Sequence, residues 1–382
     1  MADLVVSRPE GLWCEAGGFF IDPWRPVDRA LITHAHADHA RPGSRRYLCS
    51  AEGAGVLRAR LGAISLDTAD WGKAIDVGGV RVSFHPAGHA LGAAQIRLEH
   101  RGEVWVVSGD YRVEADRSCA AFEPVRCHVF VTESTFGLPV YRWAPQASVI
   151  GEILDWWRAN AAEGRASLLH CYAFGKAQRL LAGLADALGA SAGTAAEGGA
   201  LAQAPGPIVC HGAVEAINRV YREAGVALPG TVPASALADR REIGSALVLA
   251  PPSAAGSSWA RRFGDASDGF VSGWMQVRGA RRRRALDRGF VLSDHADWPG
   301  LQQAIEATGA GRVIVTHGYE AVMVRWLRER GLDAQSFATE YGGDDDGAGE
   351  APDVSAPDVS APSTDSSVQG EAGQGATPEA PR

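Results

Sequence analysis

Residues 33–39 read Thr-His-Ala-His-Ala-Asp-His and directly follow the apolar run 30–32. The segment holds three imidazoles and one carboxylate within six residues. Neutral imidazole nitrogens and carboxylate oxygens are ligands that zinc and similar divalent ions accept. A single histidine is usually a surface or core residue, but this spacing predicts a metal site. Ligands spread over six positions can bind two ions rather than one.

The pattern formed by His34, His36, Asp38 and His39 resembles the signature of the metallo-β-lactamase superfamily. This resemblance implies an αββα sandwich of four layers with its metals at one rim. Lactamases, thioester hydrolases, lactonases and nucleases all share the pattern, which is therefore specific for fold and weak for substrate. The function has to be inferred from the remaining site residues.

Length and charge narrow the class of protein. With 382 residues, the chain can bury a large core and is more typical of two domains than of one. Residues 341–382 hold nine acidic residues and one arginine, which accounts for the whole net charge of −8. The rest of the chain is neutral. If it binds nucleic acid, we expect its arginines to gather on one face.

The six cysteines include no Cys-x-x-Cys pair and no short regular spacing, which argues against a zinc ribbon or a disulfide framework. The N-terminal residues lack a basic stretch followed by a long apolar one. No apolar stretch approaches the ~18 residues that a membrane helix needs. We therefore expect a cytoplasmic protein with reduced thiols and no membrane partner.

Polar side chains recur where predicted strands end. The strand Val80–Phe84 leads to His89 in a glycine-containing loop, the strand Val104–Val107 leads to Asp110, and a further strand ends at Glu133. Glycine allows backbone to approach a site closely without steric cost. Much later in the chain, two histidines again follow β-rich apolar runs, at positions 295 and 317.

Asp22 ends the run Leu12–Asp22, which is predicted to be one strand stopped by an Asp-Pro turn. In the superfamily pattern this position holds an aspartate behind the ligands that orients the histidine loop. The other interpretation is a simple turn residue.

The chain pattern predicts an α/β protein with an interrupted sandwich. From residue 145 to 280, strand signals alternate with helix signals, which is typical of βαβ units on a largely parallel sheet. The acidic C-terminal segment has too little apolar content to fold. We predict four parts: the first part of the sandwich domain at 1–144, an inserted α/β domain at 145–280, the completion of the sandwich at 281–340 and a disordered acidic tail at 341–382. We expect the tail to be dispensable for activity.

Glu133, His295 and His317, combined with an inserted α/β domain, resemble the β-CASP branch of the superfamily, whose members are nucleases. Within it, Val277–Trp298 is most similar to the bacterial ligase-associated DNA-damage-response exonucleases, relatives of Artemis and of the cross-link-repair nucleases. The resemblance covers about Leu12–Tyr341. It implies a DNA-repair exonuclease, with an ATP-dependent DNA ligase and a helicase as functional partners.

The resemblance also implies a role for each candidate residue. One zinc ion would be held by His34, His36 and His89 and the other by Asp38, His39 and His317, with Asp110 bridging both. Manganese is the alternative metal. Two ions about 3.5–4 Å apart can activate a shared water as hydroxide and stabilise an in-line displacement at phosphorus. Asp38, His295 and Glu133 are the predicted catalytic residues, with His295 as general acid and Glu133 orienting its imidazole.

Basic residues suggest where nucleic acid binds. An arginine block precedes the strand that leads to position 295, and it consists of Arg278, Arg281, Arg282, Arg283, Arg284 and Arg288. It either grips phosphates or forms an ordinary solvated face. Lys176 begins a predicted helix, where a terminal phosphate would be stabilised, or it is an ordinary lysine of the first turn.

Three functions compete with a DNA exonuclease. A β-CASP ribonuclease is the first, because RNA-processing members keep a histidine at the position matching His317, where eukaryotic DNA-repair members are typically apolar. A catalytically silent scaffold would have lost ligands, and this chain keeps them. A small-molecule hydrolase would leave the inserted domain and the arginine block without a purpose.

Overall fold

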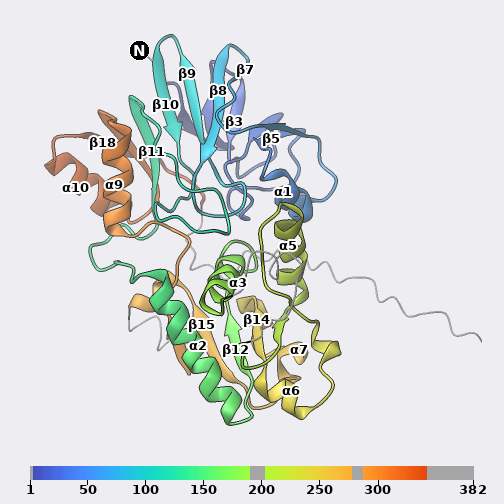
Figure 1. Cartoon of the computed structure of the whole chain (residues 1–382). Coiled ribbons are helices and arrows are strands. Elements are labelled where there is room, and N and C mark those ends of the chain that lie inside the picture. The colour runs from blue at the N-terminus through green and yellow to red at the C-terminus, as the bar shows by residue number, and fades with distance from the viewer. Residues whose placement is uncertain (1–2, 190–202, 278–286, 342–382) are drawn as a thin grey trace, which may run out of the picture. The chain divides into compact units, whose positions relative to one another are not determined.

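The chain folds into three β-sheets joined by helices (Figure 1). The computed structural model describes residues 3–189, 203–277 and 287–341. The first sheet has six strands in the order β1 (Val6–Arg8), β2 (Gly11–Cys14), β3 (Phe19–Ile21), β4 (Arg29–Leu31), β5 (Arg46–Ser50) and β6 (Leu66–Ala69). The second sheet has seven strands in the order β18 (Asp333–Ser336), β17 (Arg312–Gly318), β11 (Val129–Ser134), β10 (Glu103–Val107), β9 (Ala94–His100), β8 (Val80–Pro86) and β7 (Ile75–Val77).

The first two sheets share an apolar core. Phe19 and Ile21 of the six-stranded sheet lie in one buried cluster with Phe84, Ile96 and Trp105 of the seven-stranded sheet, and all five are fully buried. Burial of such side chains is the main favourable term in folding, so this cluster holds the two sheets against each other.

Parallel pairing brings distant residues to one edge of the seven-stranded sheet. Strand β11 pairs in parallel with β10 on one side and with β17 on the other. Because neighbouring parallel strands end at the same edge, Asp110 after β10, Glu133 in β11 and His317 in β17 come together there. This edge carries the candidate site.

The third sheet has five parallel strands in the order β13 (Ile208–Cys210), β14 (Leu247–Ala250), β12 (Ser167–His170), β15 (Ser267–Val271) and β16 (Arg288–Phe290). Helices α2 (Gln146–Ala162) and α5 (Gly212–Glu223) pack on it. The other helices of the described chain are α1 (Ala54–Leu61), α3 (Lys176–Ala187), α6 (Arg240–Ser245), α7 (Ser258–Arg261), α9 (Trp298–Thr308) and α10 (Glu320–Glu329). A mixed α/β fold with several sheets is confirmed.

Two predicted elements differ in the structure. The run Leu12–Asp22 is a hairpin of β2 and β3 and not one strand, because Gly18 adopts a φ of 64° and its N–H donates to Cys14 O across the turn at 2.9 Å. Strand β16 pairs with β15, so the five-stranded sheet continues past the boundary predicted at residue 280. The domain boundaries themselves stay predictions.

Several predictions fall on residues outside the described ranges. These are the arginines at 278 and 281–284 and the acidic tail from 342 onward. Within the described ranges, no helix is long and apolar enough to cross a membrane.

Candidate metal centre

Asp22 holds the loop that carries His34, His36, Asp38 and His39 through hydrogen bonds. The backbone N–H of Thr33 donates to Asp22 Oδ1 at 2.7 Å, and His39 Nδ1 donates to Asp22 Oδ2 at 2.8 Å. Asp22 is buried and has a φ of 43°, a backbone conformation that non-glycine residues adopt rarely. The bond to Nδ1 fixes the ring of His39 so that Nε2 faces the opposite side.

The first group of predicted ligands meets at one oxygen of Asp110. His34, His36, His89 and Asp110 each offer an atom, and these atoms all lie within 4.8 Å of one another. His34 Nε2 is 3.3 Å and His89 Nε2 is 4.0 Å from Asp110 Oδ2. His36 Nδ1 lies 3.0 Å from His89 Nε2. Side chains from three separate loops therefore converge.

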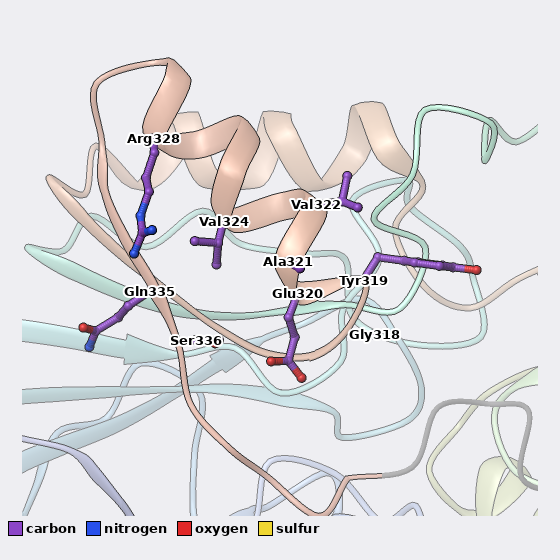
Figure 2. Close-up of a pocket in the computed structure, with 9 residues that line it drawn as sticks. All are labelled: Gly318, Tyr319, Glu320, Ala321, Val322, Val324, Arg328, Gln335 and Ser336. Atoms are coloured by element: carbon purple, nitrogen blue, oxygen red, sulfur yellow. The ribbon is translucent and has the colours of Figure 1, made fainter.

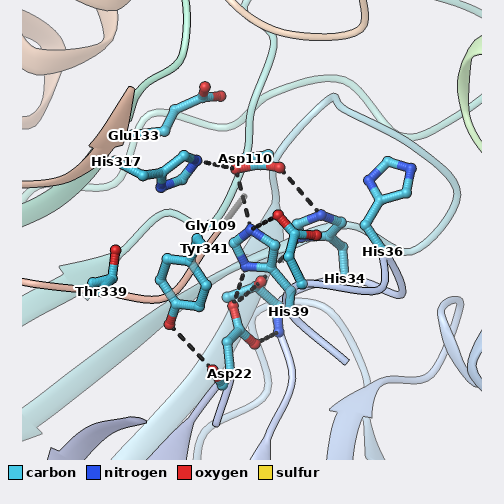
Figure 3. Close-up of polar contacts among 12 residues, drawn as sticks. Asp22, His34, His36, His39, Gly109, Asp110, Glu133, His317, Thr339 and Tyr341 are labelled. Carbon is cyan, nitrogen blue, oxygen red and sulfur yellow. Dashed lines mark hydrogen bonds and ion pairs between the residues drawn. The ribbon is translucent and has the colours of Figure 1, made fainter. Parts of the chain in front are cut away.

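The second group meets at the other oxygen of Asp110 (Figure 3). His317 Nε2 is 3.2 Å and His39 Nε2 is 3.5 Å from Asp110 Oδ1. Asp38 adds a carboxylate oxygen 3.6 Å from His39 Nε2. The carboxylate of Asp110 thus joins both groups, as a ligand shared by two cations would.

Buried atoms without hydrogen bonds indicate that this donor set fits metal ions. Among the described residues, His34 Nε2, His39 Nε2 and Asp110 Oδ1 are buried and make no hydrogen bond. Buried polar atoms in proteins are nearly always hydrogen-bonded, so several exceptions pointing into one space need an explanation. Imidazole nitrogens and carboxylate oxygens suit zinc or manganese, and cations at this position would satisfy them.

The pKa shifts of Asp110 and His34 favour the protonation states that bind a metal ion. Burial would raise the pKa of Asp110, but the imidazoles of His39 and His34 hold it well below its usual range. Burial and the neighbouring His39 lower the pKa of His34 well below its usual value. Burial also lowers the pKa of His39, yet Asp110, Asp38 and Asp22 together raise it to about 10. The carboxylate of Asp110 is therefore ionised and His34 is neutral, which are the forms that bind a metal.

His295 lies beside the ligands, and one of its ring nitrogens comes within 4.8 Å of oxygens of both Asp110 and Glu133. Its Nδ1 donates to Glu133 Oε2 at 2.9 Å, and both side chains are buried. Glu133 Oε1 also accepts the backbone N–H of Tyr111 at 2.8 Å, which fixes the carboxylate. The ring of His295 lies 4.7 Å from that of His89 between centroids. A held imidazole next to the ligand cluster is suited to proton transfer.

The predicted nucleic-acid contacts divide into three cases. Arg288 is exposed in β16, with its guanidinium 5.9 Å from the centroid of the Phe290 ring. Lys176 is fully buried and pairs with Asp294, so it presents no exposed ammonium for the predicted phosphate contact. The other five arginines of the block lie outside the described residues.

Tyr341 is a site residue that the sequence did not reveal. Its ring stacks on His39 at 4.4 Å and an interplanar angle of 12°, and its hydroxyl donates to Asp22 O at 3.2 Å. Tyr341 is the first residue of the segment predicted as a tail, and that predicted boundary stays a prediction. Thr33, which binds Asp22, and Asp294, whose carbonyl accepts from His89 Nδ1 at 2.9 Å, were also missed. Of these residues, only Asp294 had a signal in the sequence, because it directly precedes the candidate residue His295.

Truncation tests the part played by Tyr341. A chain ending at residue 341 is expected to bind zinc like the full chain, because the stacking on His39 remains. A chain ending at residue 340 is expected to bind zinc several-fold more weakly, since ligand support of this kind is worth about tenfold or more. Competition against a chromophoric chelator measures both. Equal affinities in the two truncated chains would show that Tyr341 does not support the ligand.

An open hollow of about 650 Å³ lies beside the site and is a separate feature (Figure 2). It lies between the start of α10 and strand β18 and is lined by Gly318, Tyr319, Glu320, Ala321, Val322, Val324, Arg328, Gln335 and Ser336. None of the predicted metal ligands lines it, although Gly318 directly follows His317.

Sequence comparison relates the chain to nucleic-acid enzymes. It is 31% identical over 348 residues to a probable DNA ligase from Opitutus terrae, covering 88% of this chain and 31% of that protein. It is 30% identical over 118 residues to the endoribonuclease YSH1 of Saccharomyces cerevisiae and 31% identical over 118 residues to that of Schizosaccharomyces pombe, in each case covering 30% of this chain and 15% of the relative. The chain thus spans less than a third of the length of these relatives. No family model matches it.

A solved structure shares the fold. A protein of unknown function from Enterococcus faecalis V583 superimposes with a TM-score of 0.51 and 13% sequence identity, over 82% of this chain and 80% of that chain. At this identity the likeness concerns the fold alone. The sequence relatives suggest a nuclease-related family, and this solved structure adds only the fold.

Proposed function

We propose that the protein is a metal-dependent phosphodiesterase that degrades DNA from its ends in repair, built as a metallo-β-lactamase sandwich with an inserted β-CASP domain. One observation carries the proposal: the two ligand groups share Asp110, and the Glu133–His295 pair stands beside them. That arrangement matches the requirements of in-line phosphodiester cleavage, with charge stabilised on both reacting oxygens.

Each side chain has a task in this reaction. Metal ions held at the two groups would polarise a phosphate oxygen and lower the pKa of a bound water. Asp110 would keep the two groups at a fixed separation, and Asp22 would hold His39 with Nε2 facing the site. His295 would give a proton to the leaving oxygen, since an alkoxide is a poor leaving group, while Glu133 keeps its ring oriented.

RNA is the alternative substrate. The position of His317 among the ligands favours it, because RNA-processing members of the branch keep that histidine. The similarity to the endoribonuclease YSH1 supports it further. We favour DNA because the similarity to a probable DNA ligase covers 88% of this chain, whereas that to YSH1 covers 30%. The name of that relative supports a functional link to a DNA ligase. The ATP-dependent type of ligase, the helicase and the cytoplasmic location are proposed from the family resemblance alone.

End-labelled DNA and RNA of the same sequence, single- and double-stranded, test the proposed substrate. We expect loss of nucleotides from DNA ends. The rate on DNA should exceed that on RNA by tenfold or more, which corresponds to about 1.4 kcal/mol in the activation free energy. A chelator should inhibit the reaction completely, and zinc or manganese should restore it. A tenfold preference for RNA would establish the ribonuclease. Turnover of a lactone or thioester without strand cleavage would replace both by a small-molecule hydrolase.

A further inference from the structure

The segment that opens α3 touches three of the loops that build the metal centre. The carbonyl of Phe174 lies 3.2 Å from His36 Nε2. The guanidinium of Arg179 donates to Gly88 O at 3.0 Å, one residue before His89. Lys176 Nζ lies 3.2 Å from Asp294 Oδ1. The ligand loops therefore depend for their placement on residues of the predicted inserted domain.

The ion pair between Lys176 and Asp294 is the most unusual of these contacts. The side chain of Lys176 has no exposed surface and that of Asp294 is 2% exposed. The ammonium also lies 4.6 Å from the centroid of the Tyr172 ring. Charges buried this deeply are costly unless they are paired, and breaking such a pair leaves an uncompensated charge. Removal of Lys176 would therefore leave the carboxylate of Asp294 buried without this partner.

Asp294 connects that pair to the reacting groups on both sides. Its carbonyl accepts from His89 Nδ1 at 2.9 Å, so it fixes the ring that presents Nε2 to the ligand cluster. Its chain neighbour His295 is the proposed acid. Gly175 packs so tightly here, with a φ of 82°, that a Cβ would stand 3.0 Å from Asp294 Oδ2. The start of α3 thus packs tightly against the side chain of Asp294.

We propose that Lys176 is a positioning residue: by anchoring Asp294, it holds the ligand His89 and the acid His295 in their working geometry. This role differs from the phosphate contact predicted from the sequence, because a fully buried ammonium reaches Asp294 and not the solvent. The part concerning His295 rests on the proposed function, whereas the part concerning His89 rests on metal binding alone.

Lys176→Met tests the proposal, because it keeps the length of the side chain and removes its charge. Zinc affinity, measured by chelator competition without nucleic acid, is expected to fall about 10- to 100-fold for one of the two equivalents, the usual effect of losing a group behind a ligand. With nucleic acid, kcat is expected to fall by about 10²-fold from misplacement of the acid, with KM nearly unchanged.

The matched control is Arg165→Met, which breaks an ion pair at the opposite end of β12. Arg165 Nη2 lies 3.3 Å from Asp287 Oδ2 and its side chain is 34% exposed. This variant should bind zinc and cleave like the wild type. An equal loss in both variants would reveal a general structural effect and overturn the proposal, as would a folded Lys176→Met chain with unchanged zinc affinity and kcat.

A second variant keeps the test decisive if Lys176→Met fails to fold. Adding Asp294→Asn removes the uncompensated carboxylate, so the double variant should fold better than Lys176→Met and lose no more zinc affinity than the worse single variant. Losses that simply add would mean that Lys176 does not act through Asp294. If the wild type binds two zinc ions but cleaves no nucleic acid, the proposed function fails while the zinc measurements still test the positioning of His89.

Discussion

Asp110→Asn is expected to lower cleavage by about 10³-fold or more. Its two oxygens face different ligand groups, at 3.3 Å from His34 Nε2 and 3.2 Å from His317 Nε2. An amide has a nitrogen in place of one oxygen and carries no charge, so it cannot join two cations. Losing several kcal/mol of charge stabilisation in the transition state corresponds to a rate loss of this order.

The change preserves the shape of the side chain, and therefore the fold is expected to survive it. Metal content per chain and the cleavage rate should be measured on the same preparation. Asp333→Asn is the matched control, since that carboxylate is 71% exposed and pairs with Arg312 away from the ligands. A variant at position 110 that keeps both ions and more than a tenth of the activity would contradict the bridging role.

His295→Ala is expected to slow the chemical step by about 10²- to 10⁴-fold, the usual contribution of a positioned general acid. Glu133 holds the ring at 2.9 Å. His295 also forms a group with Asp110 and Glu133 whose atoms lie within 4.8 Å of one another, but we assign the metals to the groups that contain His34 and His317. Metal content should therefore stay at the wild-type value. Glu133→Gln should cause a smaller loss in kcat, because it leaves the imidazole in place with a weaker partner.

His128→Ala is the control for the variants at His295 and Glu133. His128 accepts the backbone N–H of Val104 at 2.9 Å and lies at the start of β11, at the end of the strand opposite to the site. Single-turnover rates separate chemistry from substrate binding and product release. Loss of a metal ion in His295→Ala would make this histidine a ligand and leave the reaction without its proposed acid.

The sequence predicted the site well where chemistry is concentrated in short motifs. His34, His36, Asp38 and His39 lie within six residues, so their pattern is visible without a fold. Asp110 and the later histidines could be added because each ends a recognisable strand, and ends of parallel strands share an edge. The structure brings these residues together, while their roles as ligands stay predictions.

Features that depend on pairing across the fold could not be predicted. Lys176 follows β12 and pairs with Asp294, which follows the edge strand β16. The stacking of Tyr341 on His39 joins residues about 300 positions apart in the sequence. The sequence around β16 did not show which sheet the strand joins. The structure pairs β16 with β15, so it belongs to the five-stranded sheet. The hairpin at Gly18 was predictable in principle, since a Gly-Gly pair is a common turn signal.

The proposed reaction depends on two cations held side by side around Asp110. Anomalous diffraction at the zinc absorption edge, from crystals equilibrated with zinc, can locate them. We expect two strong peaks, one among His34, His36 and His89 and one among Asp38, His39 and His317, each within bonding distance of a different oxygen of Asp110. A single peak, or peaks away from that carboxylate, would rule out a metal pair shared by Asp110.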